Sequence, residues 1–399
     1  MNPLKDKRII LGVTGSIACY KAVDLASKLR QAGAIVDVIL TKSALQFVTP
    51  LTFQSVTGQP AHTDDDLWGN SGHVLHVGLG EKADLFVIAP ATANTLAKLA
   101  HGQADNLLTI TALAARCPLL LAPAMDGGMY DHPATQANVT TLRARGVTFA
   151  GPVAGHLASG LSGVGRMMEP LELRGVIRHK LAENGALTGK KIVVTAGGTQ
   201  EPIDPVRYIT NRSSGKQGYA IAQAALDFGA AVTLISTPTA LPVPAGAKLL
   251  SVSTANDMLK AVQSATANAD ALVMVAAVAD FRPANAAKQK IKKGDGIPTL
   301  KLAANPDILA TLATQEFPRV RVGFAAESQN LLDNAASKLR RKKLDFIVAN
   351  DISASDAGFA VDTNRVTLLF ADGRTEALPL QEKNAVAEKV IETITKLLE

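Results

Sequence analysis

The stretch TAGGTQEPIDPVRYITNRSSGKQG, residues 195–218, decides the fold of the second half of the chain. It follows a strand-like run, Lys191–Thr195, and leads into the helical pattern Tyr219–Phe228. A glycine-rich loop that joins a strand to a helix offers backbone N–H groups and a helix N-terminus to a phosphate. The same stretch also carries two acidic side chains and a polar cluster at residues 211–216. It therefore predicts a loop that can hold a nucleotide together with a carboxylate.

The order strand, glycine-containing turn, helix and strand occurs twice in the chain. Each of the two predicted helices ends at a glycine, Gly33 or Gly229, before a short β-branched strand. Strands that alternate with helices are typical of doubly wound α/β domains. We therefore predict two Rossmann-like domains, residues 1–180 and 188–399, with the boundary within Arg174–Gly189. The expected elements are strands at Arg8–Thr14, Ile35–Leu40, Leu85–Ala89, Pro118–Ala122, Ala231–Ile235, Ala271–Ala276, Val320–Phe324 and Phe346–Ala349, helices at Ala18–Ala32 and Lys383–Leu398, and a hairpin beginning with Val366–Phe370.

The composition limits the classes of partner. Hydrophobic residues make up 47% of the 399 residues and aromatic residues only 4%, so the cores must be aliphatic, as in parallel sheets covered by helices. The net charge is +6, but the lysines and arginines are spread along the chain with few aromatic residues beside them. We therefore expect no nucleic-acid partner, and attraction of phosphorylated small molecules explains the charge equally well.

The sequence also predicts the cellular compartment of the protein. The longest strongly apolar run, Ala271–Ala279, is too short to span a bilayer, and the first residues show no secretory pattern. The two cysteines, Cys19 and Cys117, form no disulfide framework. We expect a cytoplasmic protein with no membrane partner.

Ligands of open α/β sheets bind beyond the carboxyl ends of the strands. In the first half, those ends carry the loops at residues 12–18, 41–47, 89–94 and 123–130, all rich in small or polar residues. Gly15 and Ser16 lie at a predicted helix N-terminus, where they suit a phosphate, although an ordinary turn would look similar.

Read together, these loops resemble the phosphopantothenoylcysteine decarboxylases, and the tract HVGLGEKADLFVIAPATANTLAKLAHGQADNLLT, residues 76–109, matches that family almost throughout. The resemblance implies an FMN cofactor at a subunit interface of trimers, which are often assembled into dodecamers. It implies that His76 is catalytic and that Met125 contacts the substrate. It also implies that FMN is bound by Gly15, Ser16, Ser43, Thr92, Ala93 and Asn94.

Two positions depart from the family pattern. The family has an asparagine that binds the substrate carboxylate where this chain has Asp126, and an ionised aspartate only accepts hydrogen bonds. The family has a cysteine, the proton donor of the final reduction, where this chain has Ser159. Cys19 lies in the first predicted helix and Cys117 at a strand start, so neither is expected to replace that cysteine.

The second half resembles the phosphopantothenate–cysteine ligases, and the whole chain has the domain order of bifunctional coenzyme A enzymes of the CoaBC type. The resemblance implies that a phosphopantothenate carboxylate attacks the α-phosphate of CTP and that the amine of L-cysteine then displaces CMP, with Mg²⁺ present. Asn211 would orient the acyl group and Lys290 would contact the triphosphate. The implied substrate-binding residues are Met274, Val275, Ala276, Asp280, Pro306, Asp307, Ile308, Leu309, Phe324, Lys338 and Lys342.

The sequence thus favours a bifunctional enzyme of coenzyme A biosynthesis. It would ligate 4′-phosphopantothenate with L-cysteine and decarboxylate the resulting 4′-phosphopantothenoylcysteine to 4′-phosphopantetheine. One alternative is a ligase whose flavin half is a catalytically impaired scaffold. Another is an NAD-type oxidoreductase, which is weaker because neither half has a clean GxGxxG motif followed by a distant acidic residue.

Overall fold

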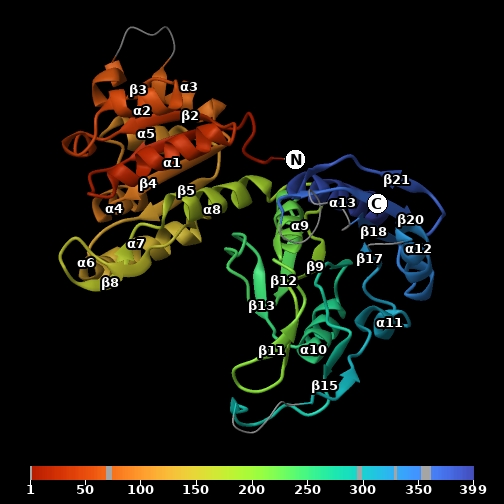
Figure 1. Ribbon diagram of the computed structural model, residues 1–399. Coiled ribbons are helices and arrows are strands. Elements are labelled where there is room, and N and C mark those ends of the chain that lie inside the picture. The colour runs from red at the N-terminus through yellow and green to blue at the C-terminus, as the bar shows by residue number, and fades with distance from the viewer. Residues whose placement is uncertain (1, 69–73, 294–298, 328–329, 352–360) are drawn as a thin grey trace. The chain divides into compact units, whose positions relative to one another are not determined.

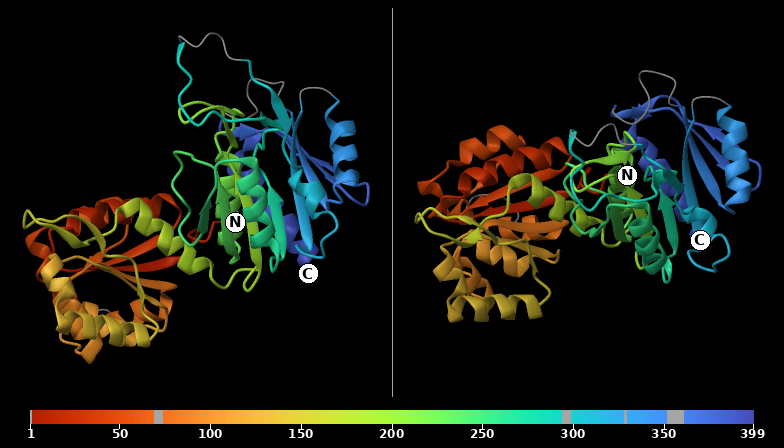
Figure 2. Two further views of the ribbon diagram at one scale, coloured as in Figure 1. Left: turned by 90° about the horizontal axis from the view of Figure 1, so that it is seen from below. Right: turned by 60° about the horizontal axis from the view of Figure 1, so that its bottom comes forward.

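The computed structural model describes residues 2–68, 74–293, 299–327, 330–351 and 361–399. The chain divides into two compact units, Asn2–Leu181 and Ala182–Glu399 (Figure 1). Each unit has a central sheet with helices on both faces (Figure 2).

The first unit alternates strands and helices along most of its length. Its elements are β1 (Arg8–Val13), α1 (Cys19–Gln31), β2 (Ile35–Leu40), η1 (Ala44–Gln46), α2 (Pro50–Thr57), β3 (Ala61–His62), η2 (Asp64–Trp68), α3 (Leu75–Lys82), β4 (Leu85–Ala91), α4 (Ala93–His101), α5 (Leu107–Ala114), β5 (Leu119–Pro123), α6 (Gly127–Asp131), α7 (Pro133–Ala144), β6 (Thr148–Phe149), β7 (Val153–His156), β8 (Ser162–Arg166) and α8 (Pro170–Ala182).

The sheet of the first unit is parallel throughout, in the order β3-β2-β1-β4-β5-β6. Successive side chains of β1 pack on opposite faces of the sheet, each in its own hydrophobic core. Ile9 and Leu11 pack with α1 and α8, whereas Ile10 packs with α4, α5 and α7. The strand order reverses between β1 and β4, so the crevice for a ligand is expected at the carboxyl ends of these two strands.

The second unit repeats this plan and extends it. Its elements are β9 (Lys191–Ala196), β10 (Gln200–Pro202), β11 (Tyr208–Thr210), α9 (Lys216–Asp227), β12 (Ala231–Ser236), β13 (Lys248–Ser251), α10 (Ala255–Thr266), β14 (Ala271–Met274), β15 (Phe281–Pro283), β16 (Leu302–Ala304), α11 (Ile308–Leu312), β17 (Val320–Glu327), α12 (Leu331–Arg341), β18 (Phe346–Asp351), β19 (Thr363–Asn364), β20 (Val366–Phe370), β21 (Thr375–Ala377), β22 (Gln381–Glu382) and α13 (Lys383–Leu398).

The large sheet of the second unit has the order β13-β12-β9-β14-β17-β18-β20-β21. It is parallel from β13 to β18, and β20 and β21 add antiparallel strands at one edge. Ile192 and Val194 of β9 pack with α9 and α13, and Val193 packs with the helices of the opposite face. The order reverses between β9 and β14, which places a second ligand crevice there.

The predicted fold class, two doubly wound α/β domains, is confirmed. Several bounds differ from the predicted ones; strand β14, for example, ends at Met274 and helix α1 spans Cys19–Gln31. The largest differences are in α9 and β17. Helix α9 begins at Lys216, three residues before the predicted start, because Gly215 adopts a left-handed conformation, with φ of 79°, directly before it. Strand β17 continues to Glu327, beyond the predicted end at Phe324. None of the helices within the described ranges is both long and apolar enough to cross a membrane.

A fragment of residues 188–399 is expected to fold independently, because every strand of its large sheet lies inside it. A longer fragment that begins at Ala182 should unfold at a higher temperature. It retains Leu187, which is 1% exposed and donates its N–H to the Phe228 carbonyl at 2.7 Å. Burial of a leucine side chain contributes about 1.5–3 kcal/mol. Circular dichroism on heating measures both fragments, and a fragment that begins at Gly197 and lacks β9 is the control that should not fold. Absence of a cooperative transition in residues 182–399 would contradict this expectation.

Candidate active sites

The first unit has a cavity of about 950 Å³ at the carboxyl ends of its strands. The loops that follow β1, β2, β4 and β5 line it, on both sides of the position where the strand order reverses. All of the residues that the sequence predicts to hold the cofactor line this cavity, namely Gly15, Ser16, Ser43, Thr92, Ala93 and Asn94.

The loop after β1 is fixed against its neighbours. A Cβ atom on Gly15 would lie 2.4 Å from the Cβ atom of Ser43, so only glycine allows the two loops to approach this closely. The hydroxyl of Thr14 donates to the Pro90 carbonyl at 2.7 Å and accepts from the Thr92 N–H at 3.1 Å. These contacts tie the loops after β1 and β4 together at the start of α1, where N–H groups suit an anion.

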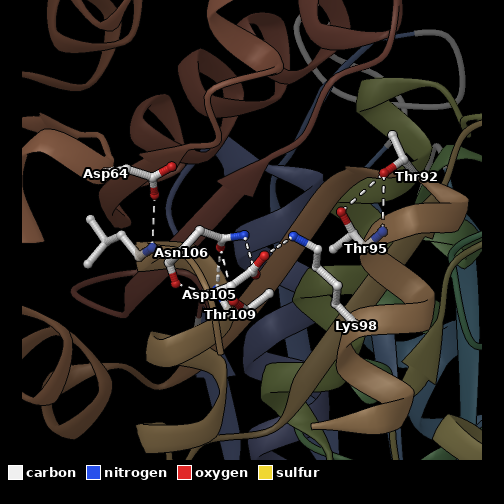
Figure 3. Close-up of polar contacts among 8 residues, drawn as sticks. Asp64, Thr92, Thr95, Lys98, Asp105, Asn106 and Thr109 are labelled. Atoms are coloured by element: carbon white, nitrogen blue, oxygen red, sulfur yellow. Dashed lines mark hydrogen bonds and ion pairs between the residues drawn. The ribbon is translucent and has the colours of Figure 1, made fainter. Parts of the chain in front are cut away.

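Polar contacts also fix the part of the wall formed by α4 and α5 (Figure 3). Thr92 caps α4 through the Thr95 N–H, and Asn106 caps α5 through the Thr109 N–H at 2.9 Å. Lys98 donates to Asp105 at 2.6 Å, and this hydrogen bond lowers the pKa of the Asp105 carboxyl. These contacts hold α4 and α5 in place along this wall of the cavity.

The two positions that depart from the family pattern contact each other. The Ser159 hydroxyl donates to Asp126 Oδ2 at 2.6 Å, and both residues line the cavity. Asp126 Oδ1 accepts the Gly128 N–H at 3.0 Å and so caps the short helix α6. The hydrogen bonds from Ser159 and Gly128 hold the pKa of Asp126 below its ordinary value. Asp126 is therefore ionised at neutral pH, and the Ser159 proton points to this carboxylate.

The structure does not bring every predicted residue of the first unit together. His76 does not line the cavity, because α3 packs against α5 through Leu79, so its first turn lies outside the cavity wall. The two cysteines also lie outside it. Burial raises the pKa of the Cys19 thiol, which donates to the Thr14 carbonyl at 3.2 Å. No thiol of this chain therefore replaces the missing cysteine.

Charged and titratable residues that the sequence analysis did not predict also line this cavity, among them His156, Lys21, Arg166 and Glu169. His156 ends β7, three residues before Ser159. Lys21 and Arg166 both contact the Glu169 carboxylate, Lys21 at 2.8 Å, and these contacts lower the pKa of Glu169. Lys21 lies within the helix pattern of α1 and His156 ends a short strand, so no local sequence pattern marked either as a site residue.

The second unit has a cavity of about 800 Å³ at the carboxyl ends of β9, β14, β17 and β18. All of the predicted substrate-binding residues of this unit line it, together with Asn211: Met274, Val275, Ala276, Asp280, Pro306, Asp307, Ile308, Leu309, Phe324, Lys338 and Lys342. Segments that are far apart in the sequence thus converge on one cavity.

The loop after β14 is held by side chains of β9 and of the loop after β11. The Thr195 hydroxyl accepts the N–H groups of Val275 and Ala276 at 3.0 and 3.1 Å. The Asn211 side-chain amide donates to the Ala277 carbonyl at 3.1 Å. These contacts fix the loop after β14, whose residues 275–280 line the cavity together with Asn211.

Asp307 and Lys342 form an ion pair in this cavity. Asp307 Oδ1 caps α11 through the Ala310 N–H at 3.1 Å and lies 2.9 Å from Lys342 Nζ. Burial acts to raise the pKa of Asp307, but the Lys342 and Ala310 hydrogen bonds outweigh it and lower that pKa. Lys342 directly follows the last residue of α12.

Lys290 does not line the cavity and is exposed. Its loop is tied to the turn between β10 and β11. The Ile291 N–H donates to Asp204 Oδ2 at 3.1 Å, and Arg207 donates to the Ile291 carbonyl at 2.6 Å. Burial acts to raise the pKa of Asp204, but the hydrogen bonds from Arg207 and three backbone N–H groups lower it well below its usual range. The structure therefore does not bring Lys290 together with the other predicted residues of this unit.

Comparison with known protein families identifies the class of each of the two domains. A family model described as Flavoprotein matches residues 2–182, and one described as DNA/pantothenate metabolism flavoprotein C-terminal domain matches residues 187–398. The chain is thus a flavoprotein domain followed by a pantothenate-metabolism domain.

Relatives match along the whole chain. The coenzyme A biosynthesis bifunctional protein CoaBC of Bacillus subtilis (strain 168) is 46% identical over 397 residues, which cover 99% of this chain and 98% of the relative. The protein with the same name from Mycobacterium tuberculosis (strain ATCC 25618 / H37Rv) is 47% identical over 408 residues, covering 98% and 97%. The chain therefore belongs to the CoaBC family of bifunctional proteins of coenzyme A biosynthesis.

Solved structures match the two halves separately. The C-terminal domain of a coenzyme A biosynthesis bifunctional protein CoaBC is 41% identical and covers 54% of this chain and 98% of its own, with a TM-score of 0.47. A PPC decarboxylase mutant complexed with pantothenoylaminoethenethiol is 36% identical and covers 44% and 97%, with a TM-score of 0.40.

Proposed function

We propose that the second unit joins 4′-phosphopantothenate to L-cysteine with CTP as the activating nucleotide, and that the first unit decarboxylates the product with FMN. The observation that carries the proposal is the convergence of the predicted residues at the reversal point of each sheet. Full-length similarity to bifunctional relatives supports both activities. Formation of CMP that depends on all three substrates tests the ligase half.

The residues of the second cavity suit a two-step acyl transfer. A carboxylate oxygen of phosphopantothenate attacks the α-phosphorus of CTP, the bond to the bridging oxygen breaks, and pyrophosphate leaves with the electron pair. The cysteine amine then attacks the acyl carbon and CMP leaves. Lys338 and Lys342 would offset the charge where two anions meet, and Asn211 would orient the acyl group.

A Mg²⁺ ion would enter with the nucleotide. The described residues contain no group of three histidine, cysteine or acidic side chains placed to hold a metal. Mg²⁺ commonly binds through one or two carboxylates together with substrate phosphates, and Asp280 lines the cavity as one such carboxylate.

The first cavity suits FMN. The cradle at Gly15 and Ser16 would hold the phosphate, and Thr92 to Asn94 form the opposite rim. Ile17, Tyr20 and Met129 also line the cavity, although each is more than half exposed, so a flat apolar ring system would cover them. A bound flavin supplies the two-electron chemistry that loss of CO₂ needs, because a plain carboxylate has no electron sink. Met125 and Asp126 would contact the substrate.

The position of His76 supports a shared site in a homo-oligomer. Its Nδ1 atom is buried without a hydrogen-bond partner in the described part of the chain, and the residue lies outside its own cavity. We propose that His76 serves the cavity of a neighbouring copy in a trimer, with dodecamers as a further level of assembly. The exposed apolar rim of the cavity is consistent with such a neighbour.

The scaffold alternative has less support. Its basis was the pair of departures at Asp126 and Ser159, but these residues satisfy each other through a hydrogen bond, and the cofactor cradle is complete. The relatives that match the full length of this chain are bifunctional proteins by name.

Replacing Lys290 with alanine should weaken nucleotide use, because the family resemblance assigns this positive charge to the triphosphate. The KM for CTP should rise about tenfold or more, while the KM for cysteine stays the same. Lys288→Ala in the same exposed loop is the matched control. Equal KM values for CTP in the two variants would contradict the role of Lys290.

Replacing Ser159 with cysteine should accelerate the last step of the decarboxylase. The Ser159 proton is held by the Asp126 carboxylate, and a hydroxyl is a far weaker acid than a thiol, whose reference pKa is about 8.5. The unaltered protein should release CO₂ and then form 4′-phosphopantetheine slowly. Single-turnover flavin absorbance with mass analysis of the product should show acceleration of up to about 10²-fold in Ser159→Cys.

Two further variants locate the proton donor. Asp126→Asn keeps an acceptor for the α6 cap and adds a donor for a substrate carboxylate, so it should improve the first step if Asp126 limits it. His156→Gln should slow the last step only if the imidazole serves as the donor. Rapid, complete turnover by the unaltered protein that neither Ser159→Cys nor His156→Gln changes would contradict the assignment of Ser159.

A further inference from the structure

Two lysine side chains line the end of the second cavity at which α9 begins, and the proposed ligase steps do not yet use them. Lys216 is the first residue of α9 and Lys383 the first residue of α13. Lys383 is only 6% exposed, and its ammonium group donates to the Val361 carbonyl. Lys216 lies 2.7 Å from an Asp362 carboxylate oxygen, and that carboxylate is 82% exposed. The Asp362 carboxylate interacts with both lysines, but its high exposure means that solvent screens this attraction.

The two lysines are held in place by the helices that carry them. The Asn364 side-chain amide donates to Gln217 Oε1 at 2.9 Å, and Gln217 Nε2 donates to the Lys383 carbonyl at 3.1 Å. Residues of α9 and α13 also pack in one core. The ammonium groups are thus placed by rigid elements, and little side-chain entropy is lost when they meet an anion.

The same end of the cavity offers backbone donors. Helix α9 has 12 residues, and no side chain caps its N-terminus after Gly215. The first N–H groups of a helix lack helical acceptors and favour negative charge. Residues 215–218 line the cavity together with Lys383. Several donors and two ammonium groups thus face one position, which suits a phosphate chain with several charges.

The pKa of Lys383 is consistent with an anion site between the two lysines. Burial and repulsion by Lys216 lower the pKa of the Lys383 ammonium, and the attraction of Asp362 opposes them. An anion bound between the two lysines would remove the repulsion. Lys342, which also lines the cavity, pairs with Asp307, whose carboxylate is 41% exposed, whereas the Asp362 carboxylate that pairs with Lys216 is 82% exposed.

We propose that Lys216 and Lys383, with the first turn of α9, bind the β- and γ-phosphates of the nucleotide and hold the pyrophosphate that leaves. The proposal rests on the ligase function of the second unit. When the bond between the α-phosphorus and the bridging oxygen breaks, the electron pair stays on pyrophosphate, and the two ammonium groups offset the charge that develops there.

Calorimetric titration of the full-length chain with inorganic pyrophosphate and Mg²⁺ tests the site directly. Lys383→Met and Lys216→Met should each weaken pyrophosphate binding about tenfold or more. Lys396→Met, at the exposed end of the same helix α13, should bind as the unaltered chain does. Lys216 is more exposed than Lys383, so its variant keeps the test valid if Lys383→Met fails to fold.

Steady-state kinetics separates the possible outcomes. The proposal expects a higher KM for CTP in both variants, with the KM for cysteine unchanged. A rise in the KM for phosphopantothenate alone, with unchanged pyrophosphate binding, would assign the site to the phosphate of that substrate and overturn the proposal. Unchanged pyrophosphate binding in both variants would also overturn it. Weakened pyrophosphate binding in a chain that forms no CMP would refute the ligase function and leave the anion site standing.

Discussion

His76→Asn is expected to abolish CO₂ release from 4′-phosphopantothenoylcysteine while the flavin stays bound. Asparagine has a similar size but cannot take up or release a proton near neutral pH. A positioned acid–base group contributes about 10²–10⁴-fold to a rate, so the variant should lose at least about 10²-fold. The cofactor cradle lies on other loops, so flavin absorbance should be the same before and after the substitution.

The control for this prediction is His101→Asn, because His101 is exposed in the last turn of α4. Single-turnover measurement of CO₂ and flavin absorbance should separate the two variants. Mixing His76→Asn chains with chains that carry an intact His76 and Gly15→Val, which disrupts the cofactor cradle, adds a test of the shared site: CO₂ release should return only if His76 serves a neighbouring copy. Equal CO₂ release by the unaltered chain and His76→Asn would remove His76 from the reaction.

Asn211→Ala is expected to slow acyl transfer to cysteine by about 10²-fold or more, the usual cost of losing an orienting donor in an acyl-transfer site. The variant should remain folded, because Asn211 is exposed and its contact is a single hydrogen bond to the Ala277 carbonyl. Isotope exchange between pyrophosphate and CTP should persist, since the first step precedes acyl transfer, whereas CMP release should fall.

Thr210→Ala is the matched control for Asn211. Thr210 ends β11, does not line the cavity, and loses only a side-chain contact to the Asn211 carbonyl. If both variants release CMP at the rate of the unaltered chain, Asn211 has no part in acyl transfer.

The sequence was sufficient for the features that depend on local patterns. Strands such as Ile35–Leu40 and the helix Lys383–Leu398 have the predicted bounds, because buried β-branched runs and a 3.6-residue period mark them clearly. Apart from His76 and Lys290, the candidate site residues line the two cavities because they lie at the carboxyl ends of strands or in the segments that follow them. This placement follows from topology, which alternating elements already indicate.

Contacts between distant residues could not be predicted in the same way. Ser159 and Asp126 are 33 residues apart, and their hydrogen bond depends on how the β7–β8 hairpin lies over α6. The two positions therefore looked like independent departures in the sequence. Lys383 likewise looked like an ordinary first residue of the final helix, and only the fold brings it to Lys216.

The most direct test of the account is a single reaction with the full-length chain, 4′-phosphopantothenate, L-cysteine, CTP and Mg²⁺, in which CMP and CO₂ are measured together. The account predicts that one CO₂ follows each CMP and that CO₂ release requires the flavin-loaded first unit. The CO₂ should appear after CMP, because the product of the ligase is the substrate of the decarboxylase. Stoichiometric CMP without CO₂ from a flavin-loaded chain would contradict the account and show that the first unit is a scaffold.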